Sequence, residues 1–410
     1  VAAQANEIFI PVLVYRTGAY APNGIPWADG FVDYLKLVNA RDGGVNGIKL
    51  AFEECETGYA TDRGVECYER LKSKKPVAVN PLSTGITYAL TEKVGNDKIV
   101  LFTTGYGRAD SVDGSVFHWN FPLLGTYWDA ADMLVQHVKK KGPLKGKKIA
   151  LVYHDSPYGK EPIPLLETRA KMEGFTLLKL PVTHPGVEQK ATWLQIRQQR
   201  PDYVFLWGWG VMNSTSIKEA IAVSYPRLQM FGVWWSSAEP DVTPAEMAAK
   251  GYNGIALGHS DERDMPVHKD MLKYLYDKGQ GTSKSKEEIG SVLYNRGMIS
   301  AMLTVEAIKQ AQSKFGKRVV TGEEVRWGAE NLNLDAPRIK QLGFGDMVQP
   351  VKTSCKDHAG THRGRIHTWD GKDWSYTSDW YTADYKVLAP LVEQSAKAYA
   401  AEKKIQPKCL

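Results

Sequence analysis

The chain has 410 residues, more than one hydrophobic core normally accommodates, so we expect at least two domains. Hydrophobic residues make up 43% and charged residues 24%, as in a globular protein, and no stretch approaches the roughly 20 apolar residues of a membrane-spanning helix. The net charge of +6 comes from dispersed charges without a basic stripe, which argues against a nucleic-acid partner.

The first residues and the cysteines bear on the compartment. The start Val1–Gln4 lacks the basic and apolar segments of a signal peptide, so we expect either a cytoplasmic protein or a mature chain whose signal has been removed. None of the four cysteines lies in a C-x-x-C pair, which argues against a zinc site and against a redox motif. Cys55 ends an expected strand and Cys67 lies in the next helix, so these two can pair, which leaves Cys355 and Cys409 as a second pair. Two disulfides fit a periplasmic or secreted protein, and four unrelated buried thiols are the alternative.

The first third of the chain alternates between strand and helix. Residues 8–14 form a continuous apolar run that predicts a buried strand, and Phe31, Leu35 and Val38 follow at helical spacing. Further strands are expected at residues 48–52, 77–80 and 99–102. This alternation predicts a parallel sheet with helices on both faces.

A second series of the same kind begins near Tyr127. It has helices at 161–173 and 191–199 and strands at 149–153, 177–180, 203–206 and 230–233. Asp370-Gly371 is a hairpin signal within the Trp- and Tyr-rich last 50 or so residues. We therefore expect two doubly wound α/β domains, with any ligand at the carboxyl ends of the strands.

Enzyme motifs are missing from the sequence. Gly208-Trp209-Gly210 and Gly343-Phe344-Gly345 lack the third glycine of a dinucleotide fingerprint, and there is no phosphate loop, H-E-x-x-H or G-x-S-x-G. A histidine metal cluster is the remaining alternative, from His358, His362 and His367, but their Gly- and Arg-rich segment favours solvated loop histidines. The sequence therefore predicts no catalytic residue, no metal and no cofactor.

Hydroxyl and aromatic residues follow the expected strands. They include Ser83-Thr84, Thr103–Tyr106, Tyr158, Trp207, Trp209 and Trp234-Trp235. Gly next to Ser or Thr exposes backbone N–H groups that can hold a carboxylate, and aromatic rings supply apolar walls. Because the ends of parallel strands converge, this pattern is typical of a ligand site.

Four motifs make the sequence resemble the type I periplasmic solute-binding proteins of ABC transporters, in the branched-chain amino acid-binding class. They are residues 43–47, residues 80–84 (similar to "GPLxS" in the family), residues 154–159 (similar to "DDxxYG") and residues 201–205 (similar to "PDxV"). The resemblance covers nearly the whole chain. It implies two α/β lobes with doubly wound parallel sheets, joined by a three-stranded hinge with crossings near residues 124, 259 and 353. The expected lobes are residues 1–124 with 260–353, and residues 125–259 with 354–410.

The resemblance also implies a ligand site in a cleft between the lobes. In the first lobe it implies that hydroxyl and N–H groups hold a carboxylate, with Arg16 and Asn23 bordering the site. In the second lobe it implies aromatic contacts. The implied ligand-binding residues are Arg16, Asn23, Ser83, Thr84, Thr104, Gly105, Tyr106, Tyr158, Trp209 and Trp234.

The sequence departs from the family pattern at one position. The family's acidic residue, which holds the ligand ammonium, is expected just after Gly232-Val233, where Trp234 stands, and Glu239 comes five residues late. A buried ammonium without an anion is costly, so we expect a hydrophobic or aromatic carboxylate. A Trp234 that faces the core is the alternative, and branched-chain amino acids, amides or urea are the alternative ligands.

The resemblance thus predicts a periplasmic, monomeric binding protein that delivers a small molecule to the membrane permease of an ABC transporter. A ligand-sensing regulatory domain on the same fold is the rival interpretation, although the sequence has no DNA-binding or membrane segment of its own. An α/β hydrolase or dehydrogenase is the enzyme rival, and it requires a nucleophile–base pair that the sequence does not provide.

Overall fold

The computed structural model describes residues 6–410, so the Val1–Gln4 start lies outside the described residues. Within the described part, no helix is both long and apolar enough to cross a membrane. The chain forms two compact units. The first comprises the described residues up to Gly125, Asp261–Thr361 and Val392–Leu410, and the second comprises Thr126–Ser260 and His362–Leu391. Both units are α/β with mainly parallel sheets, which confirms the predicted fold class.

The first unit is built around five parallel strands. They are β1 (Glu7–Val14), β2 (Lys49–Glu56), β3 (Ala78–Val79), β4 (Val100–Phe102) and β5 (Asn120–Phe121). β1 pairs with β2, β3 with β4 and β4 with β5, and a parallel bridge from Val12 to Asn80 places β3 beside β1. The resulting order is β2-β1-β3-β4-β5, in which the winding direction reverses between β1 and β3.

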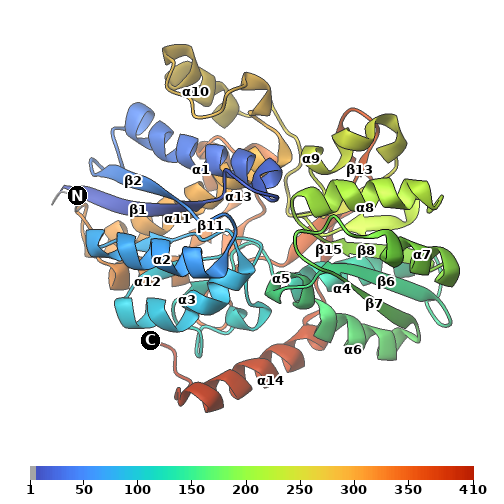
Figure 1. The fold of residues 1–410 in the computed structure, drawn as a ribbon. Coiled ribbons are helices and arrows are strands. Elements are labelled where there is room, and N and C mark those ends of the chain that lie inside the picture. The colour runs from blue at the N-terminus through green and yellow to red at the C-terminus, as the bar shows by residue number, and fades with distance from the viewer. Residues whose placement is uncertain (1–5) are drawn as a thin grey trace. The chain divides into compact units, whose positions relative to one another are not determined.

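Helices cover both faces of this sheet. Figure 1 shows α1 (Ala21–Asp42) and α2 (Thr61–Leu71) on opposite sides of β1 and β2. α1 packs against α11 (Val292–Phe315), which belongs to the segment that returns to this unit. Two glycines allow the close approach: a Cβ on Gly30 would lie 2.1 Å from the carbonyl oxygen of Tyr294. A Cβ on Gly297 would lie 2.0 Å from that of Trp27. The remaining elements of the unit are α3 (Thr84–Asp97), α10 (Pro266–Tyr274), α12 (Gly322–Glu330), α13 (Ala336–Gln341), β11 (Asn333–Leu334) and β12 (Val351–Lys352).

The second unit repeats the same strand order. Its parallel strands are β6 (Lys148–His154), β7 (Thr176–Val182), β8 (Tyr203–Trp207), β9 (Met230–Gly232) and β10 (Asn253–Ala256). They run β7-β6-β8-β9-β10, so the winding direction reverses between β6 and β8.

The sheet of the second unit continues with antiparallel strands. β13 (Arg363–Trp369) lies beside β10, and β14 (Trp374–Tyr376) and β15 (Tyr381–Thr382) pair with β13. The turn between β13 and β14 contains Asp370 and Gly371, as predicted. The helices of the unit are α4 (Tyr127–Lys139), α5 (Pro157–Lys160), α6 (Ile163–Glu173), α7 (Lys190–Gln199), α8 (Val211–Ala222) and α9 (Glu239–Val242). In Figure 1, α6 and α8 lie on opposite sides of the sheet.

The C-terminal tail corrects the predicted division. We expected all of residues 354–410 in the second lobe and three crossings, but the structure assigns 354–361 and 392–410 to the first unit. Within residues 6–410 the chain therefore crosses four times, after Gly125, Ser260, Thr361 and Leu391, the last within α14 (Tyr385–Lys403). Apolar packing is one physical reason, because Ala396 and Ala400 pack against Val116 and Phe117.

The predicted disulfides are both present. Cys55 pairs with Cys67, and Cys355 pairs with Cys409, each with a Cα–Cα distance of 5.8 Å. The second pair fastens the end of the tail to residue 355, which also belongs to the first unit. The prediction of two disulfides is confirmed, and four unrelated thiols are excluded.

Candidate functional site

The strand orders identify one candidate edge in each unit. In doubly wound sheets, ligands bind outside the carboxyl ends of the strands, where the winding direction reverses. In the first unit this is the edge where β1 and β3 end, and in the second it is the edge where β6 and β8 end.

In the first unit, the N-terminus of α3 stands directly after β3. Ser83 is the N-cap: its hydroxyl accepts a hydrogen bond from the Ile86 amide at 3.1 Å, and its carbonyl accepts one from the Thr87 amide at 2.9 Å. The first N–H groups of a helix have no intrahelical acceptor, so those of Thr84 and Gly85 are suited to an external anion. The carboxylate site at Ser83 and Thr84 stays a prediction, and the N-terminus of α3 supplies N–H groups of the kind that it requires.

The predicted carboxylate-binding residues Gly105 and Tyr106 lie in the turn after β4 and make hydrogen bonds within the protein. The N–H of Gly105 donates to the Leu123 carbonyl at 3.0 Å, and the N–H of Tyr106 donates to the Thr103 carbonyl at 3.2 Å. The Tyr106 hydroxyl donates its proton to the Phe102 carbonyl at 3.2 Å. These donors are therefore engaged within the protein, and the predicted role of Gly105 and Tyr106 in ligand binding stays a prediction.

Two threonine hydroxyls at this edge keep a proton to donate. The Thr104 hydroxyl is buried and has no hydrogen-bond partner among residues 6–410. The Thr84 hydroxyl accepts from the Gly107 amide at 3.3 Å, which leaves its own proton for another acceptor. A buried hydroxyl without a partner is costly, so a ligand oxygen at Thr104 would remove that cost.

Of the two residues predicted to border the site, Arg16 lies at the end of a strand and Asn23 lies in a helix. Arg16 follows β1, and its guanidinium contacts Asp29 and Glu54, each at 2.7 Å, so carboxylates of the protein balance its charge. Asn23 is fully buried in the first turn of α1. Arg16 thus lies at the predicted edge, and Asn23 lies inside the helix rather than in the loop before it.

In the second unit, aromatic rings gather around Tyr127. Its ring centroid lies 5.3 Å from that of Tyr158, 6.2 Å from that of Trp207 and 6.4 Å from that of Trp234. Trp209 contacts Trp235 edge to face at 5.4 Å. Tyr127 was absent from the sequence prediction because it begins α4 and follows no strand.

The backbone between the two tryptophans of residues 207–209 is held in place by side chains. The Gly208 carbonyl accepts hydrogen bonds from the Tyr158 hydroxyl at 2.7 Å and from the Ser236 hydroxyl at 2.6 Å. Ser236 also accepts the Gly208 amide at 2.9 Å. The Tyr158 ring therefore packs against Tyr127, while its hydroxyl donates a hydrogen bond that fixes the backbone of Trp207–Trp209.

Trp234 is completely buried and stacks on Tyr127 with an interplanar angle of 22°. In the segment after it, Asp241 is buried, and both of its carboxylate oxygens are bound. Asn213 Nδ2 donates to Oδ1 at 3.0 Å, and the Ala238 amide donates to Oδ2 at 2.9 Å. These bonds begin α9 and fix α8 against it, so this acid already has a structural task.

The three histidines that were weighed as a metal cluster have separate partners. The buried His358 contacts Glu330 Oε2 at 2.8 Å, His362 contacts Asp129 Oδ2 at 2.7 Å, and the buried His367 contacts the Ser260 hydroxyl at 2.7 Å. Among the described residues, no group of three or more potential ligands could hold a metal ion. The expectation of solvated loop histidines is wrong for His358 and His367, because both are fully buried.

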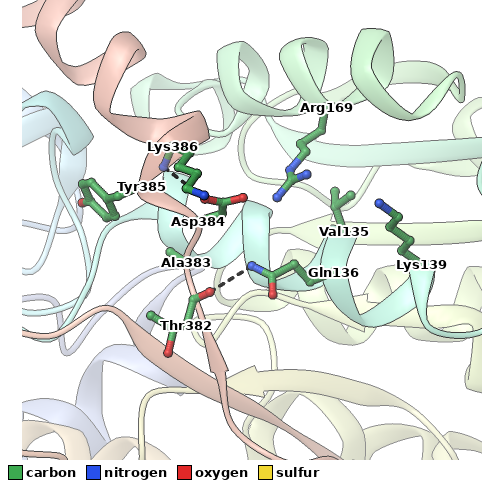
Figure 2. A pocket seen from close by; sticks show the side chains of 9 residues that line it. All are labelled: Val135, Gln136, Lys139, Arg169, Thr382, Ala383, Asp384, Tyr385 and Lys386. Carbon is green, nitrogen blue, oxygen red and sulfur yellow. Dashed lines mark hydrogen bonds between the residues drawn. The ribbon is translucent and has the colours of Figure 1, made fainter.

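A groove of about 570 Å³ in the second unit lies between α4, α6 and the start of α14 (Figure 2). Two of the three cations that line it have anionic partners: Arg169 lies 2.6 Å from Asp132, and Lys139 lies 3.0 Å from Glu173. Gln136 donates to the Thr382 carbonyl at 2.9 Å, as Figure 2 shows. These contacts fasten α6 and β15 to α4, so Arg169, Lys139 and Gln136 already have partners within the protein.

The chain is similar to known proteins over nearly its full length. A family model described as "Periplasmic binding protein" matches residues 7–373. A solved structure from the Pseudomonas fluorescens group, described as an ABC transporter permease, shares 42% identity with a TM-score of 0.90, over 99% of this chain and 100% of that chain. No curated protein matches the chain.

Two more distant structures show the same fold. One is a branched-chain amino acid ABC transporter from Thermus thermophilus with bound valine, at 21% identity and a TM-score of 0.79, over 94% of this chain and 99% of that one. The other is a solute-binding protein of an ABC transporter from R. palustris in complex with benzoate. It shares 17% identity with a TM-score of 0.70, over 91% of this chain and 96% of that one.

Proposed function

The chain belongs to the periplasmic binding protein family, and from this premise we propose that it is the periplasmic solute-binding component of an ABC transporter. The 42% identical structure, whose description names an ABC transporter, supports this role. The two disulfides support an oxidising compartment such as the periplasm. The expected partners are a small organic molecule and a membrane permease, with the binding protein acting as a monomer.

The two candidate edges are suited to binding rather than to covalent chemistry. The first offers hydroxyls and the N-terminus of a helix, which bind anions without reacting with them. The second offers aromatic rings, which supply apolar contact area. We therefore propose a protein that is not an enzyme and that releases its ligand unchanged.

We propose that the ligand is an aromatic or hydrophobic carboxylate. The single observation that carries this choice is the aromatic cluster around Tyr127, with the buried Trp234 where the family's ammonium-binding acid is expected. An ammonium placed against such rings would lose its hydration without gaining a partner anion, at a cost of several kcal/mol. A carboxylate without an ammonium escapes this cost.

Each unit would bind one part of the ligand. Ser83, Thr84 and Thr104 would bind the carboxylate through hydroxyls and the first N–H groups of α3, with Arg16 nearby. Tyr158, Trp209 and Trp234 would contact the apolar part. Three of the predicted residues would hold the backbone around the site in place rather than contact the ligand. The donors of Gly105 and Tyr106 are engaged within the protein, and Asn23 is buried in α1.

Calorimetric titration with matched probes tests the ligand class. Benzoate and phenylacetate supply the acid and the ring, phenylalanine and leucine add the ammonium, and benzamide removes the charge. We expect heat from at least one of the two simple acids and little from the other three compounds. Tight binding of leucine or phenylalanine would contradict this account of the pocket and would favour the amino acid alternative, while the family assignment would stand.

A further inference from the structure

The turn that leads into α3 has an unusual backbone conformation. Leu82 has a φ of +48°, in the left-handed region that residues with a side chain rarely occupy. It directly precedes Ser83, the N-cap of α3, so its conformation sets the direction in which the first N–H groups of the helix point. The Leu82 side chain is buried at 4% exposure, which gives a reason for leucine to stand where glycine would be less strained.

Two buried tyrosine hydroxyls hold the backbone of Leu82 from both sides. The Tyr15 hydroxyl donates to the Leu82 carbonyl at 3.0 Å, and the Tyr106 hydroxyl accepts the Leu82 amide at 2.8 Å. Tyr15 directly follows β1 and Tyr106 lies in the turn after β4, and the two residues are 1% and 3% exposed. We call this pair and its bonds to Leu82 the tyrosine clamp.

We propose that Tyr15 and Tyr106 are positioning residues that hold Leu82 in its left-handed conformation and so orient the N-terminus of α3 for a carboxylate ligand. The part of this proposal that concerns a carboxylate ligand rests on the proposed function, whereas the hydrogen bonds of the tyrosine clamp are present without a ligand. Tyr106 thus acts through Leu82 and does not touch the ligand.

The surroundings of both rings support this role. Tyr15 fits closely against α1, because a Cβ on Gly24 would lie 2.4 Å from the Tyr15 ring. The ring of Tyr59 meets Tyr15 edge to face at 5.1 Å. Burial raises the pKa of Tyr106, so the hydroxyl keeps the proton that it donates to Phe102, and its oxygen is directed to the Leu82 amide.

Tyr106→Phe and Tyr15→Phe test the clamp, because each removes one hydroxyl and keeps the ring. In the ligand-free protein we expect the amides of Ile86 and Thr87 to exchange with deuterium about tenfold faster, since Tyr15→Phe loses one buried hydrogen bond and Tyr106→Phe loses two. Benzoate affinity should fall by about tenfold, while any weak binding of the neutral benzamide changes less than about twofold. Tyr225→Phe is the matched control, because it removes a buried hydroxyl that donates to the Pro201 carbonyl at 3.0 Å, in the second unit.

A second change distinguishes positioning from general stabilisation. Glycine adopts the left-handed conformation without strain, so in a Leu82→Gly background Tyr106→Phe should change exchange at Ile86 and benzoate affinity by less than about twofold relative to Leu82→Gly alone. An undiminished effect of Tyr106→Phe in that background, or faster exchange spread through the whole first unit in the single variants, would overturn the proposal. Unchanged exchange at Ile86 and Thr87 in both single variants would overturn it as well. Absence of benzoate and phenylacetate binding by the unmutated chain would instead refute the proposed ligand class, and the exchange measurements would still decide the clamp.

Discussion

Thr104→Val should weaken ligand binding and, at the same time, stabilise the free protein. Valine has nearly the shape of threonine and removes only the hydroxyl. Thr104 is 1% exposed, and its hydroxyl has no hydrogen-bond partner among residues 6–410. The ligand-free protein is therefore destabilised by the burial of this hydroxyl. Protein data place that cost at roughly 1–3 kcal/mol, and we expect the variant to recover about 1 kcal/mol of it.

The loss of affinity follows from the same hydroxyl. A hydrogen bond to a charged group contributes roughly 1.5–3 kcal/mol, so the affinity for a carboxylate should fall about ten- to a hundredfold. Urea unfolding measures the first effect, and calorimetric titration with benzoate or phenylacetate measures the second. The opposite signs of the two changes identify a polar group kept for the ligand.

Thr91→Val is the contrasting control. The Thr91 hydroxyl donates to the Thr87 carbonyl at 2.7 Å and accepts Asn120 Nδ2 at 3.2 Å, so its removal breaks satisfied bonds away from the candidate edge. It should lower stability by about 1 kcal/mol and leave affinity unchanged. If Thr104→Val also lowered stability and left affinity unchanged, the reasoning about the unpartnered hydroxyl would be refuted.

Three further predictions concern the aromatic cluster, the disulfides and pH. Trp234→Ala should lower the free energy of unfolding by about 3–5 kcal/mol in urea titrations, because it empties a fully buried position, and a loss below about 1 kcal/mol would show that Trp234 is not packed as described. Replacing both cysteines of the 355–409 pair by serine should lower the free energy of unfolding by about 4 kcal/mol, against about 3 kcal/mol for the 55–67 pair, because the sequence separations are 54 and 12 residues. A larger loss for the 55–67 pair in urea unfolding would contradict this. Burial, together with the nearby His184, lowers the pKa of His154 to about 4, below the ordinary value of about 6.5 in the unfolded chain. The neutral His154 therefore leaves the free energy of unfolding at its full value above pH 6.5, and this free energy falls as the pH is lowered toward 4, by about 2 kcal/mol at pH 5. His154→Gln should reduce the dependence of the free energy of unfolding on pH between pH 7 and 5.

Much of the architecture follows from local patterns in the sequence. The apolar run of residues 8–14 and the strand and helix alternation after it determine β1, β2 and the helix α1 between them. Cys55 and Cys67 belong to consecutive elements, so their pairing could be inferred from the position of each in its element. The hydroxyls at Ser83 and Thr84 and the tryptophans after β8 and β9 could be located for the same reason, because a strand end is visible in the sequence.

Tertiary structure alone decides which of these groups are still available to a ligand. The Gly105 amide is engaged by Leu123 and the Tyr106 hydroxyl by Phe102 and Leu82, and no local pattern shows that these carbonyls and amides come within reach. The same holds for Tyr127, which becomes the centre of the aromatic cluster because α4 packs against the second sheet, and for the tail, which Ala396 and Ala400 bring to the first unit. Periodicity reports which face of an element is apolar, whereas the partner of a buried donor depends on how distant segments approach one another. The sequence therefore determined which side chains gather at the strand ends, and the fold decided which of their hydrogen bonds are already made.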